Sequence, residues 1–129
     1  MPSIDDVLER ARRRFTRVEP GQAAAEMAQG ALLVDTRTDS QRAQHGDIPG
    51  ALVIDRTVME WRLDPASPWR IPQATDHQKR VIVICNEGYS SSLAAASLQD
   101  VGLVNATDVI GGFQAWKAAG LPVKHRPRR

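Results

Sequence analysis

Apolar residues along the chain form short blocks that alternate between two periodicities. Consecutive apolar residues are typical of strands covered on both faces, and strand-like runs occur at 31–35 ("ALLVD"), 51–55 ("ALVID"), 81–85 ("VIVIC") and 107–110 ("TDVI"). Helix-like spacing of apolar residues occurs at 4–14, 21–30, 90–102 and 113–120. Strands that alternate with helices predict an α/β fold, in which a parallel sheet has helices on both faces.

The composition is that of an ordinary globular domain. The chain has 129 residues, of which 42% are hydrophobic and 25% are charged, so we expect one domain and no membrane span. The first residues lack the apolar core of a secretory signal, and a single cysteine cannot form an internal disulfide. Both features predict a cytoplasmic protein.

Basic residues are concentrated near the two ends. Residues 10–17 contain five arginines and no acid, and residues 124–129 contain four further basic residues, whereas the rest of the chain is acidic. We interpret these clusters as a solvated helix face and a loose tail. Phe15 is the single aromatic residue among these arginines, so the sequence shows no repeated pairing of aromatic and basic residues and a nucleic-acid partner is not expected.

The only cysteine, Cys85, follows the most strand-like run and precedes a polar loop that leads into an alanine-rich helix. Cys85 is therefore expected at the carboxyl end of a strand, and ligand sites in open α/β sheets lie at the edge that these strand ends form. Glycine in the loop and the start of the next helix together turn several backbone N–H groups toward one point, which favours an anion there. The anion would be the sulfur of Cys85, with its pKa lowered as a nucleophile or a sulfur carrier requires.

Two alternatives remain open from the residues alone. Cys85 could be a structural cysteine that packs as a small hydrophobic side chain. A metal site is disfavoured, because the three histidines are scattered and a zinc site needs further ligands at close spacing.

Four stretches resemble motifs of the rhodanese family of sulfurtransferases, in the same order and with the same spacing. They are "LLVDTR", "GDIPGALVI", "VIVICNEGYSSSLAA" and "ATDVIGGFQAWKAAGLPV". The resemblance implies a rhodanese-like domain at 19–123, preceded by a helix and lead-in at 1–18 and followed by a basic tail at 124–129. It also implies a mostly parallel sheet of five strands and a cysteine that cycles between thiol and persulfide.

The resemblance carries over to single residues of the loop and of the first strand. Cys85 matches the nucleophile that accepts sulfur, and Asp35 with Arg37 matches an ion pair for which we favour a structural role. The loop residues whose amides surround the sulfur match Asn86, Glu87, Gly88, Tyr89 and Ser90, with Ser91 next in the anion-binding loop. No metal or organic cofactor is implied.

Three positions depart from the family pattern. Ser90 stands where many relatives carry arginine, Glu87 adds a carboxylate that would repel an anionic donor and raise the pKa of the cysteine, and Asp47 stands where histidine is common. A phosphatase of the same kind of fold has a longer loop that ends in arginine, and that position is Ser91 here. We therefore do not expect phosphate-ester hydrolysis. Trp61 and Arg62, in the long connection before Cys85, are candidates for the entrance.

We predict a sulfurtransferase in which the Cys85 thiolate takes a sulfane sulfur from thiosulfate or a persulfide. A thiol, cyanide or an acceptor protein would then remove that sulfur. The alternative is a binding or regulatory module with little turnover, which Glu87 and the missing loop arginine favour and the intact cysteine disfavours. A redox sensor would need an outside thiol, because the chain has no second cysteine.

Overall fold

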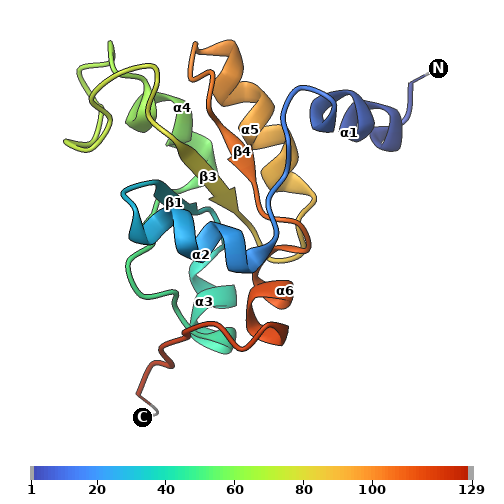
Figure 1. Ribbon diagram of the computed structural model, residues 1–129, viewed down its shortest axis with the longest axis vertical. Coiled ribbons are helices and arrows are strands. Elements are labelled where there is room, and N and C mark those ends of the chain that lie inside the picture. The colour runs from blue at the N-terminus through green and yellow to red at the C-terminus, as the bar shows by residue number, and fades with distance from the viewer. Residues whose placement is uncertain (1, 128–129) are drawn as a thin grey trace.

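Four short parallel strands form the centre of the structure, a computed structural model that describes residues 2–127 (Figure 1). The strands are β1 (Leu32–Asp35), β2 (Leu52–Val53), β3 (Val81–Ile84) and β4 (Thr107–Asp108), in the spatial order β2-β1-β3-β4. All three pairings are parallel, as the alternation of strands and helices predicts. The number of strands differs from the five that we expected. Val18 adds only a single parallel bridge to Val109, because Pro20 begins a helix two residues later.

Six α-helices and one 3₁₀ helix surround this sheet in the described part of the chain. They are α1 (Ile4–Arg12), α2 (Pro20–Ala28), α3 (Asp39–His45), the 3₁₀ helix η1 (Arg56–Val58), α4 (Met59–Leu63), α5 (Ser90–Asp100) and α6 (Gly112–Ala118). Two of them begin with reciprocal capping, in which the side chain of Ser3 or Thr38 accepts a backbone N–H and the third helical residue caps in return. None of the helices in residues 2–127 is long and apolar enough to span a bilayer.

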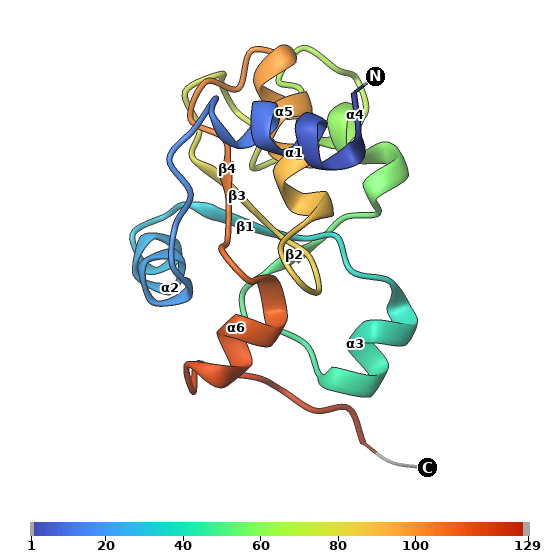
Figure 2. The same cartoon turned by 90° about the vertical axis from the view of Figure 1, so that its right-hand side faces the viewer.

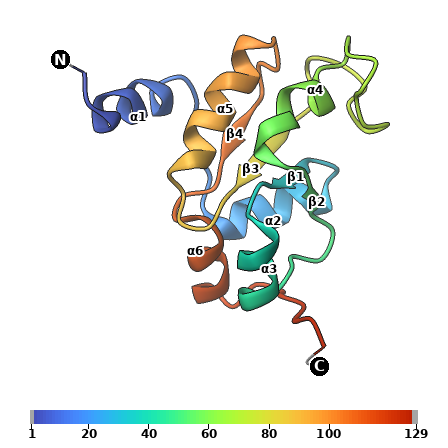
Figure 3. The same cartoon turned by 180° about the vertical axis from the view of Figure 1, so that it is seen from behind.

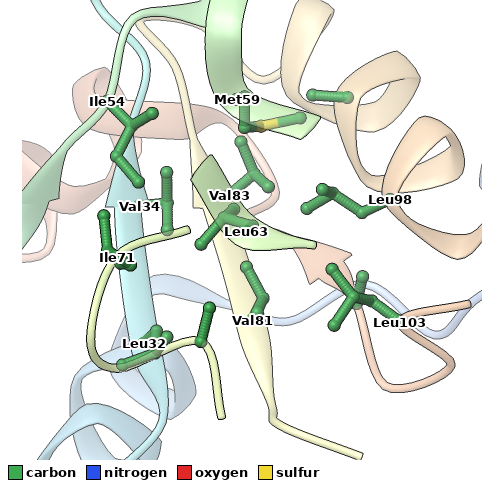
Figure 4. Packing of buried hydrophobic residues seen from close by; sticks show 13 residues of the cluster. Leu32, Val34, Ile54, Met59, Leu63, Ile71, Val81, Val83, Leu98 and Leu103 are labelled. Atoms are coloured by element: carbon green, nitrogen blue, oxygen red, sulfur yellow. The ribbon is translucent and has the colours of Figure 1, made fainter. Parts of the chain in front are cut away.

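The alternation of side chains along β1 and β3 divides the core into two layers. Leu32, Val34, Val81 and Val83 face one side, where α4 and α5 cover them with Met59, Leu63 and Leu98 (Figure 4). Leu33, Ile82 and Ile84 face the other side, where Phe113 and Trp116 of α6 and Ala23 of α2 lie. Both central strands are therefore fully buried, which explains why their sequences are uninterrupted apolar runs.

The basic segment near the N-terminus differs in part from the expected solvated face. Helix α1 packs along α5 (Figure 2), and Arg14 forms an ion pair with Asp100 at the end of that helix. Arg12 and Arg17 are partly buried and point toward the loop that follows β3. Our interpretation of this cluster as a solvent-facing surface is wrong for those two residues.

The C-terminal segment is tied down as far as the structure describes it. Lys124 pairs with Asp47 in an antiparallel bridge, and the segment that follows α6 passes next to α3 (Figure 3). Arg126 donates to the carboxylates of Asp39 and Asp47. Asp47 thus has an ion-paired structural role at the position where the resemblance suggested histidine. The last two residues of the expected basic tail, 128–129, lie outside the described residues.

Candidate active site

The polar segments after β1 and β3 meet at one edge of the sheet. From β1 the chain crosses to β2 on one side, whereas from β3 it crosses to β4 on the other side. The carboxyl ends of two adjacent parallel strands that diverge in this way form the crevice where α/β proteins bind ligands. Thr36, Arg37 and Thr38 come from one strand, and the loop that begins at Cys85 comes from the other.

Two backbone N–H groups point at the sulfur of Cys85. The N–H of Gly88 lies 3.2 Å from Sγ, and the N–H of Ser91, in the first turn of α5, lies 3.4 Å from it. Gly88 has φ of +87°, a conformation that strains residues with a Cβ and that bends the loop around the sulfur. Cys85 itself is buried, with 6% of its surface exposed. The thiol therefore lies at the bottom of a cradle of peptide donors.

The carbonyl groups of the loop are held on the outside by other donors. The first N–H groups of α6 donate to the loop, from Phe113 to the carbonyl of Cys85 at 2.8 Å and from Gln114 to that of Asn86 at 3.1 Å. The carbonyl of Tyr89 accepts the N–H of Ser92 at 3.1 Å. A trans peptide unit points its N–H opposite to its C=O, so outward carbonyls leave N–H groups directed inward.

Two glycines at the start of α6, Gly111 and Gly112, allow this close approach. A Cβ on Gly112 would lie 2.5 Å from the carbonyl oxygen of Cys85, 2.7 Å from the nitrogen of Gly88 and 2.8 Å from that of Glu87. No side chain fits there, because all three neighbours are backbone atoms. Gly112 is therefore required for the backbone of α6 to support the cysteine loop.

A buried carboxylate organises the start of α5. Asp108, at the end of β4, is fully buried and accepts the hydroxyl protons of Ser91 at 2.8 Å and Ser92 at 2.7 Å. Its charge is balanced by Arg17, whose Nε and Nη2 lie 2.8 and 3.0 Å from the two carboxylate oxygens. A buried charge is tolerated when it is paired and hydrogen-bonded in this way.

A pocket of about 380 Å³ opens above the sulfur. Its lining residues are Thr36, Arg37, Thr38, Gln41, Cys85, Asn86, Glu87, Tyr89 and Ser90. Most of these side chains are neutral hydrogen-bonding groups, and Tyr89 is exposed at the rim with 61% of its surface accessible. The pocket thus gives a small polar substrate access to the thiol.

The cysteine loop and the glycine pair at the start of α6 both lie in a region that matches a known protein family. Residues 19–119 match the family model of the Rhodanese-like domain. The chain belongs to the rhodanese family. It is 36% identical to the thiosulfate sulfurtransferase GlpE of Pseudomonas savastanoi over 104 residues, which cover 81% of this chain and 89% of that protein.

Two further relatives extend this comparison. The thiosulfate sulfurtransferase GlpE of Haemophilus influenzae is 34% identical over 109 residues, covering 84% of this chain and 94% of the relative. A solved Rhodopseudomonas palustris protein of unknown function, described as a "Possible Tyrosine Phosphatase", superimposes with a TM-score of 0.85 at 31% identity, and the match covers 96% of both chains.

The surroundings of the thiol in this rhodanese favour its ionised form. Burial raises the pKa of Cys85, but hydrogen bonds from the side chains of Ser91 and Ser90 and from the N–H groups of Ser91 and Gly88 lower the pKa by more. The Ser91 hydroxyl has one proton, which the geometry directs to Asp108, so the backbone donors are the ones available at all times. Glu87 is exposed and is not among the main causes of this pKa shift.

Asp35 and Arg37 form a buried pair beneath the pocket. The Nη2 of Arg37 donates to Asp35 Oδ2 at 2.7 Å and to the carbonyl of Gly46 at 3.0 Å, and its guanidinium lies 3.9 Å from the ring centroid of Phe113. The Arg37 side chain is fully buried and forms an ion pair with Asp35, which supports the structural role that we expected for the two residues.

The expected entrance residues lie elsewhere. Trp61 and Arg62 do not line the pocket above Cys85 in the described part of the chain, because α4 packs on α5 and directs them to other surfaces. Arg62 instead donates to the carbonyl of Trp69 at 2.8 Å. Sequence reasoning missed Thr36, Thr38 and Gln41. The position of Thr36 and Thr38 just after a buried strand could have indicated them, whereas Gln41 lies in α3 and carried no such signal.

The lowered pKa of Cys85 predicts alkylation at unusually low pH. Only the thiolate reacts with iodoacetamide, so the rate should reach half of its maximum at a pH below that of an unstructured cysteine peptide. Rates measured from pH 5 to 10, by mass spectrometry, give this midpoint directly. A midpoint at or above that of the peptide would show that the cradle does not stabilise the thiolate.

Replacement of Gly112 by alanine should disrupt the loop. The added Cβ must displace the backbone around Cys85, and overpacking of this kind costs about 1–3 kcal/mol. We expect iodoacetamide alkylation of Cys85 at pH 7 to slow about tenfold, as the N–H donors move away. Gly120→Ala is the matched control. The φ of Gly120, +73°, is close to the +61° of Gly112, but no atom lies within 4 Å of a Cβ added at Gly120. Equal alkylation rates in the two variants would contradict this role of Gly112.

Proposed function

We propose that this rhodanese-like sulfurtransferase carries a sulfane sulfur on Cys85 between a donor and a thiophilic acceptor. The thiolate attacks the outer sulfur of thiosulfate, the new S–S bond forms as the old one breaks, and sulfite leaves with the electron pair. Cyanide or a thiolate then attacks the outer sulfur of the persulfide and regenerates the Cys85 thiolate. No proton needs to be removed in the first step when the thiolate is already populated.

The N–H groups of Gly88 and Ser91 at 3.2 and 3.4 Å from Sγ are the observation that carries this proposal. A persulfide carries its negative charge on the outer sulfur, in the same loop, so fixed peptide donors in a partly dry site stabilise both the thiolate and the charged intermediate. The loop residues Asn86, Glu87, Gly88, Tyr89, Ser90 and Ser91 supply the walls and the donors of this site.

The substrate partners follow from the shape and charge of the pocket. A small anion such as thiosulfate fits a volume of about 380 Å³, and so does the end of a persulfide chain. Glu87 lines this pocket, and its carboxylate opposes a dianion more than it opposes a persulfide. We therefore rank a persulfide above thiosulfate as the preferred donor. A free cysteine that must cycle through thiolate and persulfide also suits a reducing compartment such as the cytoplasm.

Phosphate-ester hydrolysis is less well supported by the site. Ser91 occupies the position where a phosphatase loop of this kind ends in arginine. Within residues 2–127, Arg37 is the only arginine that lines the pocket, and its Nε and Nη2 donate to Asp35. Hydrolysis of p-nitrophenyl phosphate therefore serves as a negative control for the transfer assay.

The direct test of the function is thiocyanate formation from cyanide with either donor. The wild-type protein should turn over, whereas Cys85→Ser should give only the background rate, because a serine hydroxyl does not accept sulfane sulfur. If the wild-type protein turns over neither donor while its cysteine is reduced and reactive, the binding-module alternative replaces the proposed function.

Glu87→Gln should improve the use of thiosulfate. Removal of the carboxylate from the pocket should raise kcat/KM for thiosulfate about three- to tenfold at low ionic strength, and added salt should reduce this gain. An uncharged organic persulfide should show less than a twofold change. Glu60→Gln, at a carboxylate paired with Arg56 outside this pocket, is the matched control. An equal gain with both donors would rule out electrostatic selection by Glu87.

A further inference from the structure

Two arginines from the N-terminal segment converge on one carbonyl of the cysteine loop. The Nη2 of Arg12 lies 2.8 Å from the carbonyl oxygen of Gly88, and the Nη2 of Arg17 lies 2.9 Å from the same atom. Both residues precede residue 19, where the match to the family model begins. The contact thus joins a segment outside the matched region to the backbone around Cys85.

The remaining contacts of the two guanidinium groups fix them in place. Arg17 is held by both oxygens of Asp108, and Arg12 donates from Nε to Ser92 Oγ at 3.0 Å and lies 5.7 Å from the ring centroid of Tyr89. Among the ion pairs of residues 2–127, none includes Arg12. Its positive charge is therefore not neutralised by a carboxylate in direct contact.

The carbonyl of Gly88 belongs to the same peptide unit as the N–H of Tyr89. The described peptide bonds are all trans, so this N–H points away from the two arginines. Charge-assisted hydrogen bonds are about twice as strong as neutral ones, and two of them hold this unit in one orientation. The carbonyls of Cys85, Asn86 and Tyr89 are instead held by backbone N–H groups.

We propose that Arg12 and Arg17 are positioning residues for sulfur transfer, which orient and polarise the Gly88–Tyr89 peptide unit from outside the pocket. Their action passes through the loop backbone, because the Gly88 carbonyl and its neighbours lie between them and the sulfur. In this way the N-terminal segment supplies cationic support to a loop whose own sequence, Cys85 to Ser91, contains no basic residue. This inference rests on the proposed function of Cys85.

Arg12→Met is the most informative variant, because it keeps an unbranched aliphatic side chain at this position and leaves the Arg17–Asp108 pair intact. We expect kcat/KM for sulfur transfer at pH 7 to fall about fivefold or more, mostly in kcat, since the residue does not line the donor pocket. The midpoint of the alkylation pH profile should rise by about half a unit, as the N–H donors become less well ordered. Arg12→Lys should restore part of both losses, because an ammonium keeps the charge but not the forked geometry.

Arg13→Met is the matched control, since Arg13 is on the same helix segment, is exposed and contacts only Glu9 among the ion pairs of the described residues. Its kinetics and its alkylation profile should equal those of the wild type. A purely structural role of Arg12 would lower the melting temperature while leaving the alkylation midpoint and kcat unchanged, and that result would overturn the inference. Alkylation needs no sulfur donor, so failure of the proposed function and failure of this inference give different results.

Discussion

The orientation of a few peptide units in one short loop is the constraint on which the rest of the site depends. A thiolate in a buried place is stable only if dipoles replace the water that it loses, and here those dipoles are the N–H groups of Gly88 and Ser91. Peptide units are rigid, so N–H groups converge inward only when their carbonyls are held outward. The peptide units next to those of Gly88 and Ser91 are held in this way, because the carbonyls of Cys85, Asn86 and Gly88 accept hydrogen bonds from α6 and from the N-terminal segment.

The fold brings these distant donors together through its strand order. Because β1 and β3 are adjacent and the chain leaves them in opposite directions, the loops after both strands open at the same edge. The glycine pair at the start of α6 lets that helix contact the loop backbone, and Asp108 links β4 to the first turn of α5. The site is therefore assembled from separate parts of the sequence, which the sheet and the helices around it bring together.

The local part of this structure could be predicted from the sequence. The apolar runs at β1 and β3, the helices and the cysteine loop carry strong patterns, and the parallel sheet is confirmed. Contacts between distant side chains could not be predicted in this way. Arg12 and Arg17 were interpreted as a solvated surface, because the sequence of their segment does not indicate a contact with Gly88. Trp61 and Arg62 were expected at the entrance, but the packing of α4 places them on other surfaces.

Intact mass measurement of the reduced protein after incubation with a persulfide donor tests the central claim most directly. The wild-type protein should gain the mass of one sulfur atom, cyanide or excess thiol should remove it, and Cys85→Ser should gain nothing. Absence of this gain in wild-type protein whose Cys85 is shown by alkylation to be reduced and accessible would contradict the claim that the loop stabilises a persulfide on this residue.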